Sequence, residues 1–278
     1  MPKPEIQIAS LGKTNISQIV ECLTASFKNY FVKMPSEVDF WRKRFNAARV
    51  DYDLSIGCFD DGKLIAFIIH GIDIHNGEKT AFNTGTGVME DYRGQKLVDK
   101  MYDFVFPNLR KNGITKCMLE VIDENERAIR VYERIGFKKD RFLRCYKGEA
   151  KKVMVDTNVE EIDISDIKSR INHYQKFYSW DNALNAILTG GKMFSTYMIK
   201  NLDSEDLGYM VINNTNDALI QLEAFDDKHW MDVLGSVHKV IPNIRINNVD
   251  DDRKLAIKIF NNSKLENHIN QYEMLLKL

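Results

Sequence analysis

Residues 88–96 read Val88-Met89-Glu90-Asp91-Tyr92-Arg93-Gly94-Gln95-Lys96, and this run is the most informative stretch of the chain. A β-type segment ends at Val88, a short polar turn follows, and a helix is predicted to begin with Arg93 and Gly94 at its mouth. The first turn of a helix presents unpaired backbone N–H groups and the positive end of the helix dipole. The run therefore indicates a binding site for a pyrophosphate.

The residues before this run predict an antiparallel meander. Asp60-Asp61-Gly62-Lys63 and His75-Asn76-Gly77 interrupt apolar β-type runs, and Asp-Gly and Asn-Gly pairs are strong hairpin signals. The expected elements are a strand near residues 6–8, helices over residues 16–27 and 37–47, and strands over residues 54–59, 64–70, 72–74 and 80–88.

The residues after the run continue with a helix and a buried strand. Apolar residues recur near the helical period from Leu97 to Leu109, although Pro107 should kink this helix or end it early. Asn112-Gly113 closes the helix, and residues 114–121 read as a buried strand.

The next helix has the clearest pattern in the chain. Asp123 and Glu126 are placed like a capping box, and Gly136 marks its end. Its apolar residues share the spacing i, i+3, i+4, i+7: Ala128, Val131, Tyr132 and Ile135. A final strand over residues 142–146 completes the order, which predicts an α/β fold (α+β, with a mixed sheet).

The second half of the chain repeats this layout. At an offset of 128 residues, residues 256–260 match residues 128–132 in character at every position, after a strand, a helix and a strand expected over residues 218–225, 228–240 and 244–249. The repeat has no Arg-Gly turn and carries Phe260 in place of Tyr132. We therefore expect domains over residues 1–148 and 149–278, the second degenerate. Two unrelated amphipathic helices are the alternative.

Composition sets the general class of protein. The chain has 278 residues, 44% hydrophobic and 28% charged, which suits two globular domains. No run approaches the length of a membrane span, and the first residues lack the layout of a signal peptide. The four cysteines form no C-x-x-C pair, so we expect neither a disulfide framework nor a zinc site. We expect a cytoplasmic location with reduced thiols.

Charge is divided unevenly between the two halves. Residues 1–148 carry 24 Lys and Arg against 20 Asp and Glu, whereas residues 149–278 carry 15 against 20. A basic half suits a polyanionic ligand and an acidic half suits a cationic one, although a plain solvated surface explains this small bias almost as well. Nucleic-acid binding is not expected, because the sequence has no cluster of basic residues interleaved with aromatic residues.

Two signals in the right order resemble the GNAT superfamily of N-acetyltransferases. The first is the cofactor motif Arg/Gln-x-x-Gly-x-Gly/Ala, here Arg93-Gly94-Gln95-Lys96-Leu97-Val98, and the second is Asn125, Ala128, Tyr132 and Gly136-Phe137. Lys96 and Val98 stand where the family has small residues. A helix start does not require positive φ, so we expect Lys96 to be compatible with the turn and able to pair with a phosphate. A relative that does not use CoA is the alternative.

The resemblance implies the acyl-CoA N-acyltransferase fold, in two tandem copies, with acetyl-CoA as cosubstrate. The strand end Thr86-Gly87-Val88 should separate from its neighbour and pair with the pantetheine amides, while Asn125 reaches the cofactor or caps its helix. The implied cofactor-binding residues are Thr86, Gly87, Val88, Arg93, Gly94, Gln95, Lys96, Leu97, Val98 and Asn125.

The resemblance also implies two catalytic residues. Tyr132 matches the tyrosine that protonates the departing CoA thiolate, and a tyrosine packed in the core is the alternative. Glu120 occupies the place of a proposed general base, for which Glu90 is a poorer candidate. A base is useful because a lysine-type amine is about three pKa units from neutrality at pH 7, or roughly 4 kcal/mol.

Other phosphate-binding and metal chemistries do not fit the spacing. Gly87 and Gly94 are too far apart for a Walker loop, Glu90 replaces the third glycine of a dinucleotide fingerprint, and the histidines show no metal-ligand spacing. The expected function is therefore acetyl transfer from acetyl-CoA to a primary amine of a small molecule or peptide, without a metal. A CoA-binding sensor without catalysis is the alternative, and a homodimer remains open.

Overall fold

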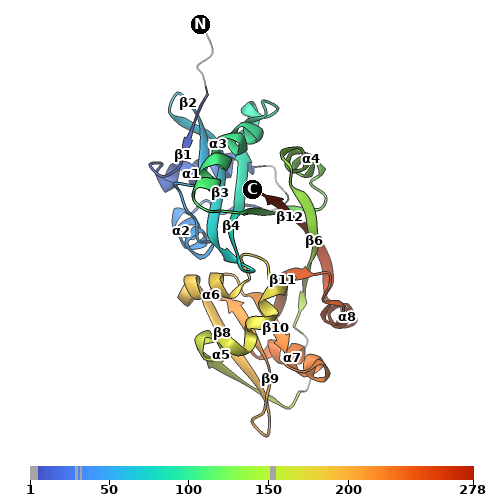
Figure 1. The fold of residues 1–278 in the computed structure, drawn as a ribbon. Coiled ribbons are helices and arrows are strands. Elements are labelled where there is room, and N and C mark those ends of the chain that lie inside the picture. The colour runs from blue at the N-terminus through green and yellow to red at the C-terminus, as the bar shows by residue number, and fades with distance from the viewer. Residues whose placement is uncertain (1–5, 29–30, 32, 151–154) are drawn as a thin grey trace. The chain divides into compact units, whose positions relative to one another are not determined.

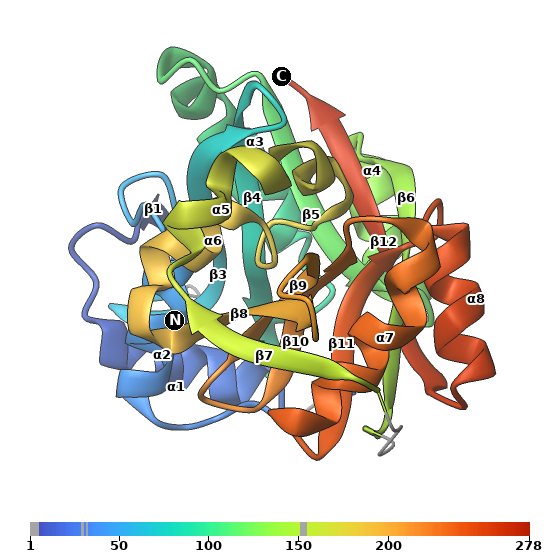
Figure 2. The same ribbon diagram turned by 90° about the horizontal axis from the view of Figure 1, so that it is seen from below.

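The computed structural model describes residues 6–28, 31, 33–150 and 155–278. The chain divides into two compact units, one of Met1–Asp140 with Glu273–Leu278 and the other of Arg141–Tyr272. Each unit contains a β-sheet covered by helices (Figure 1). A view turned by 90° shows the same elements from below (Figure 2).

The first unit is built on the predicted meander. Strands β1 to β4 pair antiparallel, and β4 then pairs in parallel with β5. The turns Asp61-Gly62 and Asn76-Gly77 have positive φ throughout, as two-residue hairpins of the primed type require. Its elements are β1 (Gln7–Ser10), α1 (Ile16–Ser26), α2 (Val38–Ala47), β2 (Ile56–Asp60), β3 (Lys63–His75), β4 (Glu78–Val88), α3 (Leu97–Lys111), β5 (Lys116–Ile122) and α4 (Glu126–Ile135).

Two local predictions for this unit were wrong. The helix begins at Leu97 rather than at Arg93, after a short 3₁₀ turn at Glu90–Tyr92. Pro107 lies inside α3, and the helix does not end early but continues to Lys111. Val105 and Leu109, on either side of the proline, are both fully buried and hold this part of the helix in place despite the missing hydrogen bond.

The second correction concerns the cap of α4. Asn125, not Asp123, directly precedes the helix, and its side-chain oxygen accepts a hydrogen bond from the N–H of Ala128 at 3.2 Å. Asp123 falls in the turn after β5, too early to reach that first turn. Gly136 ends the helix with φ of 114°, as predicted.

The second unit carries helices on both faces of its sheet. Adjacent residues of a strand point to opposite faces, and on β9 Tyr209 packs with α5 and α6 whereas Met210 packs with α7 and α8. The sheet order is β12-β6-β11-β10-β9-β8-β7. The elements are β6 (Lys138–Glu149), β7 (Thr157–Ile162), α5 (Ile164–Ile171), α6 (Leu184–Gly190), β8 (Phe194–Asn201), β9 (Asp206–Asn213), β10 (Ala218–Ala224), α7 (Trp230–Ser236), β11 (Asn243–Asp250), α8 (Lys254–Asn262) and β12 (Glu266–Lys277).

The internal repeat is visible in the element boundaries. Helices α4 and α8 both start, and strands β6 and β12 both start and end, 128 residues apart. Lys264 has φ of 61° at the position where Gly136 ends α4. In each copy a helix joins two parallel strands, α3 between β4 and β5 and α7 between β10 and β11.

The last strands of the two copies are exchanged. From Arg141 onward β6 belongs to the second unit and pairs with β11, whereas Glu273–Leu278 belong to the first unit. There the end of β12 lies next to β5, and the N–H of Leu278 donates to the carbonyl of Thr115 at 2.9 Å. The sheet of the first unit is therefore completed by the C-terminus of the chain.

Several general features concern the whole described chain. All four cysteines are buried thiols, and burial raises the pKa of Cys22 and of Cys117 to about 12.

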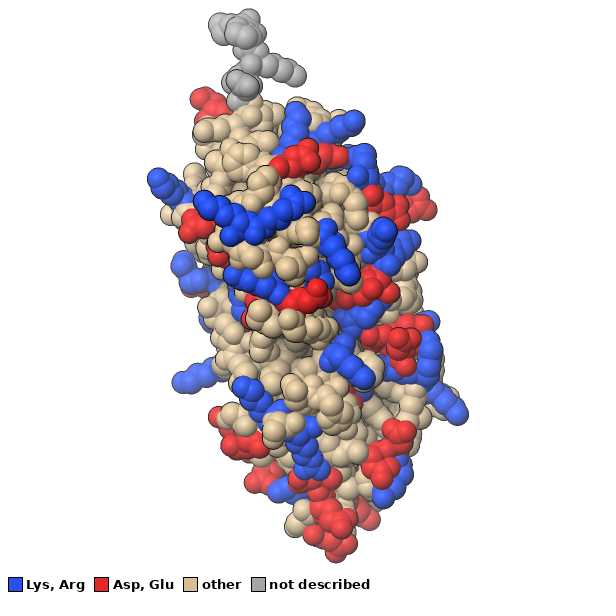
Figure 3. All heavy atoms as spheres, in the orientation of Figure 1, with Lys and Arg blue, Asp and Glu red and all other residues tan. Residues whose placement is uncertain are grey.

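Within the described residues no helix is long and apolar enough to cross a membrane, and no cluster of His, Cys, Asp and Glu could hold a metal ion. Basic and acidic side chains are interspersed on the face shown in Figure 3.

A buried ion pair joins β10 to the start of α8 in the second unit. Glu223, 1% exposed, accepts hydrogen bonds from Arg253 at 2.6 Å and from the Tyr178 hydroxyl at 2.5 Å. Burial raises the pKa of Glu223 to about 7, although Arg253 opposes this shift. Each of these two buried charges is therefore stabilised by the other.

We expect Arg253→Ala to lower the free energy of unfolding by about 3–5 kcal/mol, because it leaves a buried carboxylate without its partner. Arg130→Ala is the matched control, since Arg130 pairs with Glu126 at 2.9 Å on an exposed helix face and exposed pairs contribute little. Urea unfolding followed by circular dichroism measures both. Equal losses in the two variants would contradict the importance of the buried pair.

Candidate functional site

A cavity of about 590 Å³ lies in the first unit, where β4 leaves β5 and where α3 and α4 begin. Ten of the twelve predicted site residues line it: Thr86, Gly87, Val88, Arg93, Gly94, Lys96, Leu97, Val98, Asn125 and Tyr132. The structure thus brings together two segments of sequence that lie about thirty residues apart.

The cavity exists because two parallel strands separate. The last residue pair of β4 and β5 is Asn83 with Leu119, yet β4 continues to Val88 and β5 to Ile122. Ile69 lies opposite Gly85 and His70 opposite Asn83, so Thr84 is an extra residue that bends β4 at this point. The separation agrees with what the resemblance led us to expect of Thr86-Gly87-Val88.

The start of α3 forms one wall. Gly94 has φ of 80°, and a Cβ there would meet nothing within 4 Å, so open space lies in front of this backbone. The N–H of Lys100 is bonded to the carbonyl of Lys96, so the N–H groups of the preceding residues at the helix start have no partner within the helix. This wall can present several backbone donors to an anion.

Lys96 corrects one expectation. It lies in the left-handed region, with φ of 54° and ψ of 33°, directly before the first residue of α3. The position therefore does require positive φ, which explains why the family motif has a small residue at this position. A residue with a Cβ is strained there by roughly 1–2 kcal/mol.

Arg93 braces the site from its side. Its guanidinium donates to the carbonyl of Ser26 at 2.8 Å and to that of Val88 at 3.2 Å, which ties the end of α1 to the end of β4. Gly87 is held equally closely, since a Cβ there would lie 2.6 Å from the Phe67 ring. The two residues fix the path of the chain beside the cavity.

Helix α4 forms the opposite wall. Tyr132 is half-buried, and its ring meets that of Phe137 edge-on at 5.9 Å. The predicted apolar stripe of this helix is only half-buried, because it faces the cavity rather than a packed core; Ile129 is the buried residue of α4. Asn125 caps the helix and also lines the cavity.

Sequence reasoning missed a set of arginines. Arg127, Arg130 and Arg134 all line the cavity and recur at intervals of three and four residues, which places them on one face of α4. That spacing was the signal that could have found them. With Arg93 and Lys96 they give five cationic residues against one carboxylate in the lining, Asp99.

Asp99 does not oppose this positive field effectively. Arg134 binds it through two hydrogen bonds of 2.6 and 2.7 Å, which lower the pKa of the carboxyl below its usual value. The ion pair also fastens α4 to α3. The remaining cations leave the cavity suited to a polyanion.

Two predicted site residues are placed elsewhere. Among the described residues that line the cavity, neither Gln95 nor Glu120 is found. Gln95 is exposed to solvent, and Glu120 is half-buried on β5, one residue beyond the last pair with β4.

The corresponding place in the second unit is occupied by an ion pair. There β10 and β11 share the pair Leu219 with Ile246, and the ion pair of Glu223 and Arg253 stands between the end of β10 and the start of α8. Arg253 is the residue that the 128-residue repeat aligns with Asn125. The gap that is a cavity in the first unit is thus bridged by side chains in the second.

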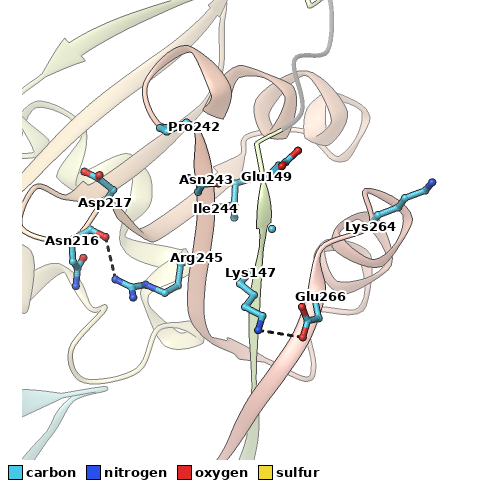
Figure 4. Close-up of a pocket in the computed structure, with 11 residues that line it drawn as sticks. Lys147, Glu149, Asn216, Asp217, Pro242, Asn243, Ile244, Arg245, Lys264 and Glu266 are labelled. Atoms are coloured by element: carbon cyan, nitrogen blue, oxygen red, sulfur yellow. Dashed lines mark hydrogen bonds and ion pairs between the residues drawn. The ribbon is translucent and has the colours of Figure 1, made fainter. Parts of the chain in front are cut away.

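Another cavity of about 590 Å³ lies at a different place in the second unit (Figure 4). Its charges are balanced, with Lys147 paired to Glu266 at 3.3 Å and Arg245 bonded to the Asn216 carbonyl at 3.1 Å. It contains none of the predicted site residues.

Part of the chain is similar to known acetyltransferases. Residues 17–137 match the model of the family described as "Acetyltransferase (GNAT) family". N-alpha-acetyltransferase 30 of Schizosaccharomyces pombe is 27% identical over 96 residues, covering 34% of this chain and 63% of that protein, so the chain spans less than two thirds of that relative. The [ribosomal protein bS18]-alanine N-acetyltransferase of Escherichia coli K12 is 29% identical over 118 residues, covering 42% and 77%.

A solved structure also matches the whole chain. A tandem GNAT protein from the clavulanic acid biosynthesis pathway has a TM-score of 0.69 at 11% identity, covering 98% of both chains. At this identity the match shows the fold. The predicted mixed α/β fold in tandem copies is therefore confirmed.

We expect Lys96→Gly to raise the free energy of unfolding by about 0.5–1 kcal/mol, because relief of the left-handed strain exceeds the entropy that glycine adds to the unfolded chain. Lys96→Ala is the control, since it removes the ammonium but keeps the Cβ and should give no such gain. Urea unfolding compares the three proteins. A glycine variant no more stable than the alanine variant would contradict the strain.

Proposed function

The chain belongs to the GNAT superfamily, and on that premise we propose that it transfers an acetyl group from acetyl-CoA to a primary amine. The observation that carries the proposal is the cationic cavity at the separation of β4 from β5, lined by the residues of the family motif. We assign cofactor binding and catalysis to the domain of residues 1–148, since every residue that lines this cavity lies between Ser26 and Arg134.

The chain's own groups fit the cofactor. The open backbone at Gly94 and the first turn of α3 would hold the pyrophosphate, and Lys96 and the arginines of α4 would neutralise the phosphates. The separated end of β4 would pair its backbone with the pantetheine amides. Bound acetyl-CoA would supply the activated acetyl thioester.

We assign the proton transfers to two residues. As the amine nitrogen bonds to the acetyl carbon, the carbon–sulfur bond breaks and the Tyr132 hydroxyl gives its proton to the sulfur. Glu120 takes a proton from the amine, directly or through a water, since it lies on β5 just beyond the point of separation but outside the cavity lining. Proton transfer by positioned groups typically contributes ~10²–10⁴ in rate.

We propose the α-amine of a peptide as the first acceptor class to test. Both curated relatives are named as enzymes of α-amine or alanine acetylation. An α-amino group has a pKa near 7.7–8.0, so a sizeable share is neutral at cytosolic pH, unlike a lysine side chain near 10.4. The four unbridged thiols suit a cytoplasmic location, which is part of this proposal.

The test is release of CoA from acetyl-CoA with a panel of peptides and small amines. We expect turnover by the full chain and, for Tyr132→Phe, a fall in kcat on the order of 10²-fold with KM for acetyl-CoA little changed. The ring keeps its contact with Phe137, so the fold should hold. Equal turnover by the variant would return Tyr132 to a packing role, and binding without any turnover would indicate a sensor.

Gly94→Asp should weaken CoA binding at least tenfold, about 1.4 kcal/mol, because it sets a negative charge and a Cβ against the pyrophosphate. Gly94→Asn is the matched control: it has the same shape, tolerates the left-handed backbone and carries no charge. We expect the asparagine variant to bind more tightly than the aspartate variant in calorimetry. Unchanged binding by Gly94→Asp would place the cradle elsewhere.

A further inference from the structure

One polar side chain holds the separated end of β4. Asn83, 6% exposed, is the last residue of β4 that pairs with β5. Its side-chain nitrogen donates to the Thr86 hydroxyl at 2.6 Å and to the Tyr102 hydroxyl at 2.8 Å, and its side-chain oxygen accepts from the N–H of Gly85 at 3.1 Å. These bonds use both donors of the amide and one lone pair.

The direction of these hydrogen bonds is fixed by chemistry. A backbone N–H can donate only to the oxygen of an amide, so the bond from Gly85 orients the Asn83 side chain and turns its NH₂ group toward the two hydroxyls. Each hydroxyl therefore accepts from Asn83 and keeps its own proton to donate. Thr86 lines the cavity, whereas Tyr102 is fully buried.

The anchor of this network is a buried tyrosine. Tyr102 on α3 is fully buried and meets the Phe137 ring edge-on at 5.4 Å, and Phe137 in turn meets Tyr132. Burial also raises the pKa of Tyr102 well above its ordinary value, so the hydroxyl stays protonated. The end of β4 contacts Tyr102 through Asn83, and the proposed acid Tyr132 contacts it through Phe137. Both are thus connected to the same buried ring.

We propose that Asn83 is a positioning residue that holds Gly85–Val88 apart from β5 and turns the proton of the Thr86 hydroxyl into the cavity, toward a carbonyl oxygen of the bound acyl-CoA. This proposal rests on the proposed function for the identity of the ligand. The holding of the strand is a property of the protein alone. Thr86 is the residue that touches the ligand, and Asn83 acts through it.

Asn83→Asp separates the two roles. A carboxylate accepts from Gly85 as before but must also accept from the two hydroxyls, so the strand stays held while the Thr86 proton is drawn away from the cavity. We expect acetyl-CoA affinity, measured by calorimetry, to fall at least fivefold in Asn83→Asp and in Thr86→Val, and to stay within twofold in Thr86→Ser. The double variant Asn83→Asp/Thr86→Val should bind acetyl-CoA no more than twofold more weakly than Thr86→Val alone. Both changes remove the same hydrogen bond from the Thr86 hydroxyl to the ligand.

A second measurement needs no ligand. Hydrogen exchange in the free protein should be at least tenfold faster at the Gly85 amide in Asn83→Ala and unchanged in Thr86→Val. Wild-type affinity in Asn83→Asp, multiplicative losses in the double variant, or equal exchange in Asn83→Ala would each overturn the assignment. A wild-type chain that fails to bind acetyl-CoA would instead overturn the proposed function and leave the exchange result standing.

Discussion

The parting of β4 from β5 after Asn83 and Leu119 is the constraint on which the first unit depends. Strands that part leave backbone N–H and C=O groups without ladder partners, and such groups are costly to bury unpaired. Three features satisfy or hold this part of the backbone. They are an extra residue at Thr84, the hydrogen bonds of Asn83, and the Arg93 guanidinium, which donates to the carbonyls of Val88 and Ser26. The first turns of α3 and α4 open onto the same space, so unpaired donors and cations gather there.

The second unit begins from the same topology and solves the same problem differently. Parallel strands β10 and β11 again flank a helix, but Glu223 and Arg253 meet across the gap at 2.6 Å, and the rings of Tyr178 and Trp230 lie 5.7 and 5.5 Å from the Arg253 guanidinium. A bridged gap needs no ligand to satisfy its polar groups. An open gap with cationic walls leaves its polar groups to water or to an anionic ligand, and this is the physical difference between the two units.

What could be predicted from the sequence was local. Asp61-Gly62 and Asn76-Gly77 specify turns whatever surrounds them, and Gly136 ends a helix because its φ of 114° suits no other residue well. Ten of the predicted residues line one cavity, and their grouping followed from one run and one helix pattern. Lys96 was misjudged because its left-handed backbone is imposed by the turn before α3, which no periodicity reveals. The bond from Asn83 to Tyr102 and the pair of Arg134 with Asp99 join residues far apart in sequence, so only the folded chain shows them.

The exchange of β6 and β12 lay beyond prediction for a different reason. The two strands occupy equivalent places in the repeat and begin and end 128 residues apart, so nothing local states which sheet each one joins. Its outcome is that the first unit needs Glu273–Leu278, the last residues of the second copy, beside β5. A chain ending near Gly148 would lack that strand and leave the edge of β5 unpaired, although β5 carries Glu120. The second copy has no Arg-Gly turn and carries Phe260 in place of a tyrosine, yet it supplies a strand of the sheet on which the first copy builds its cavity.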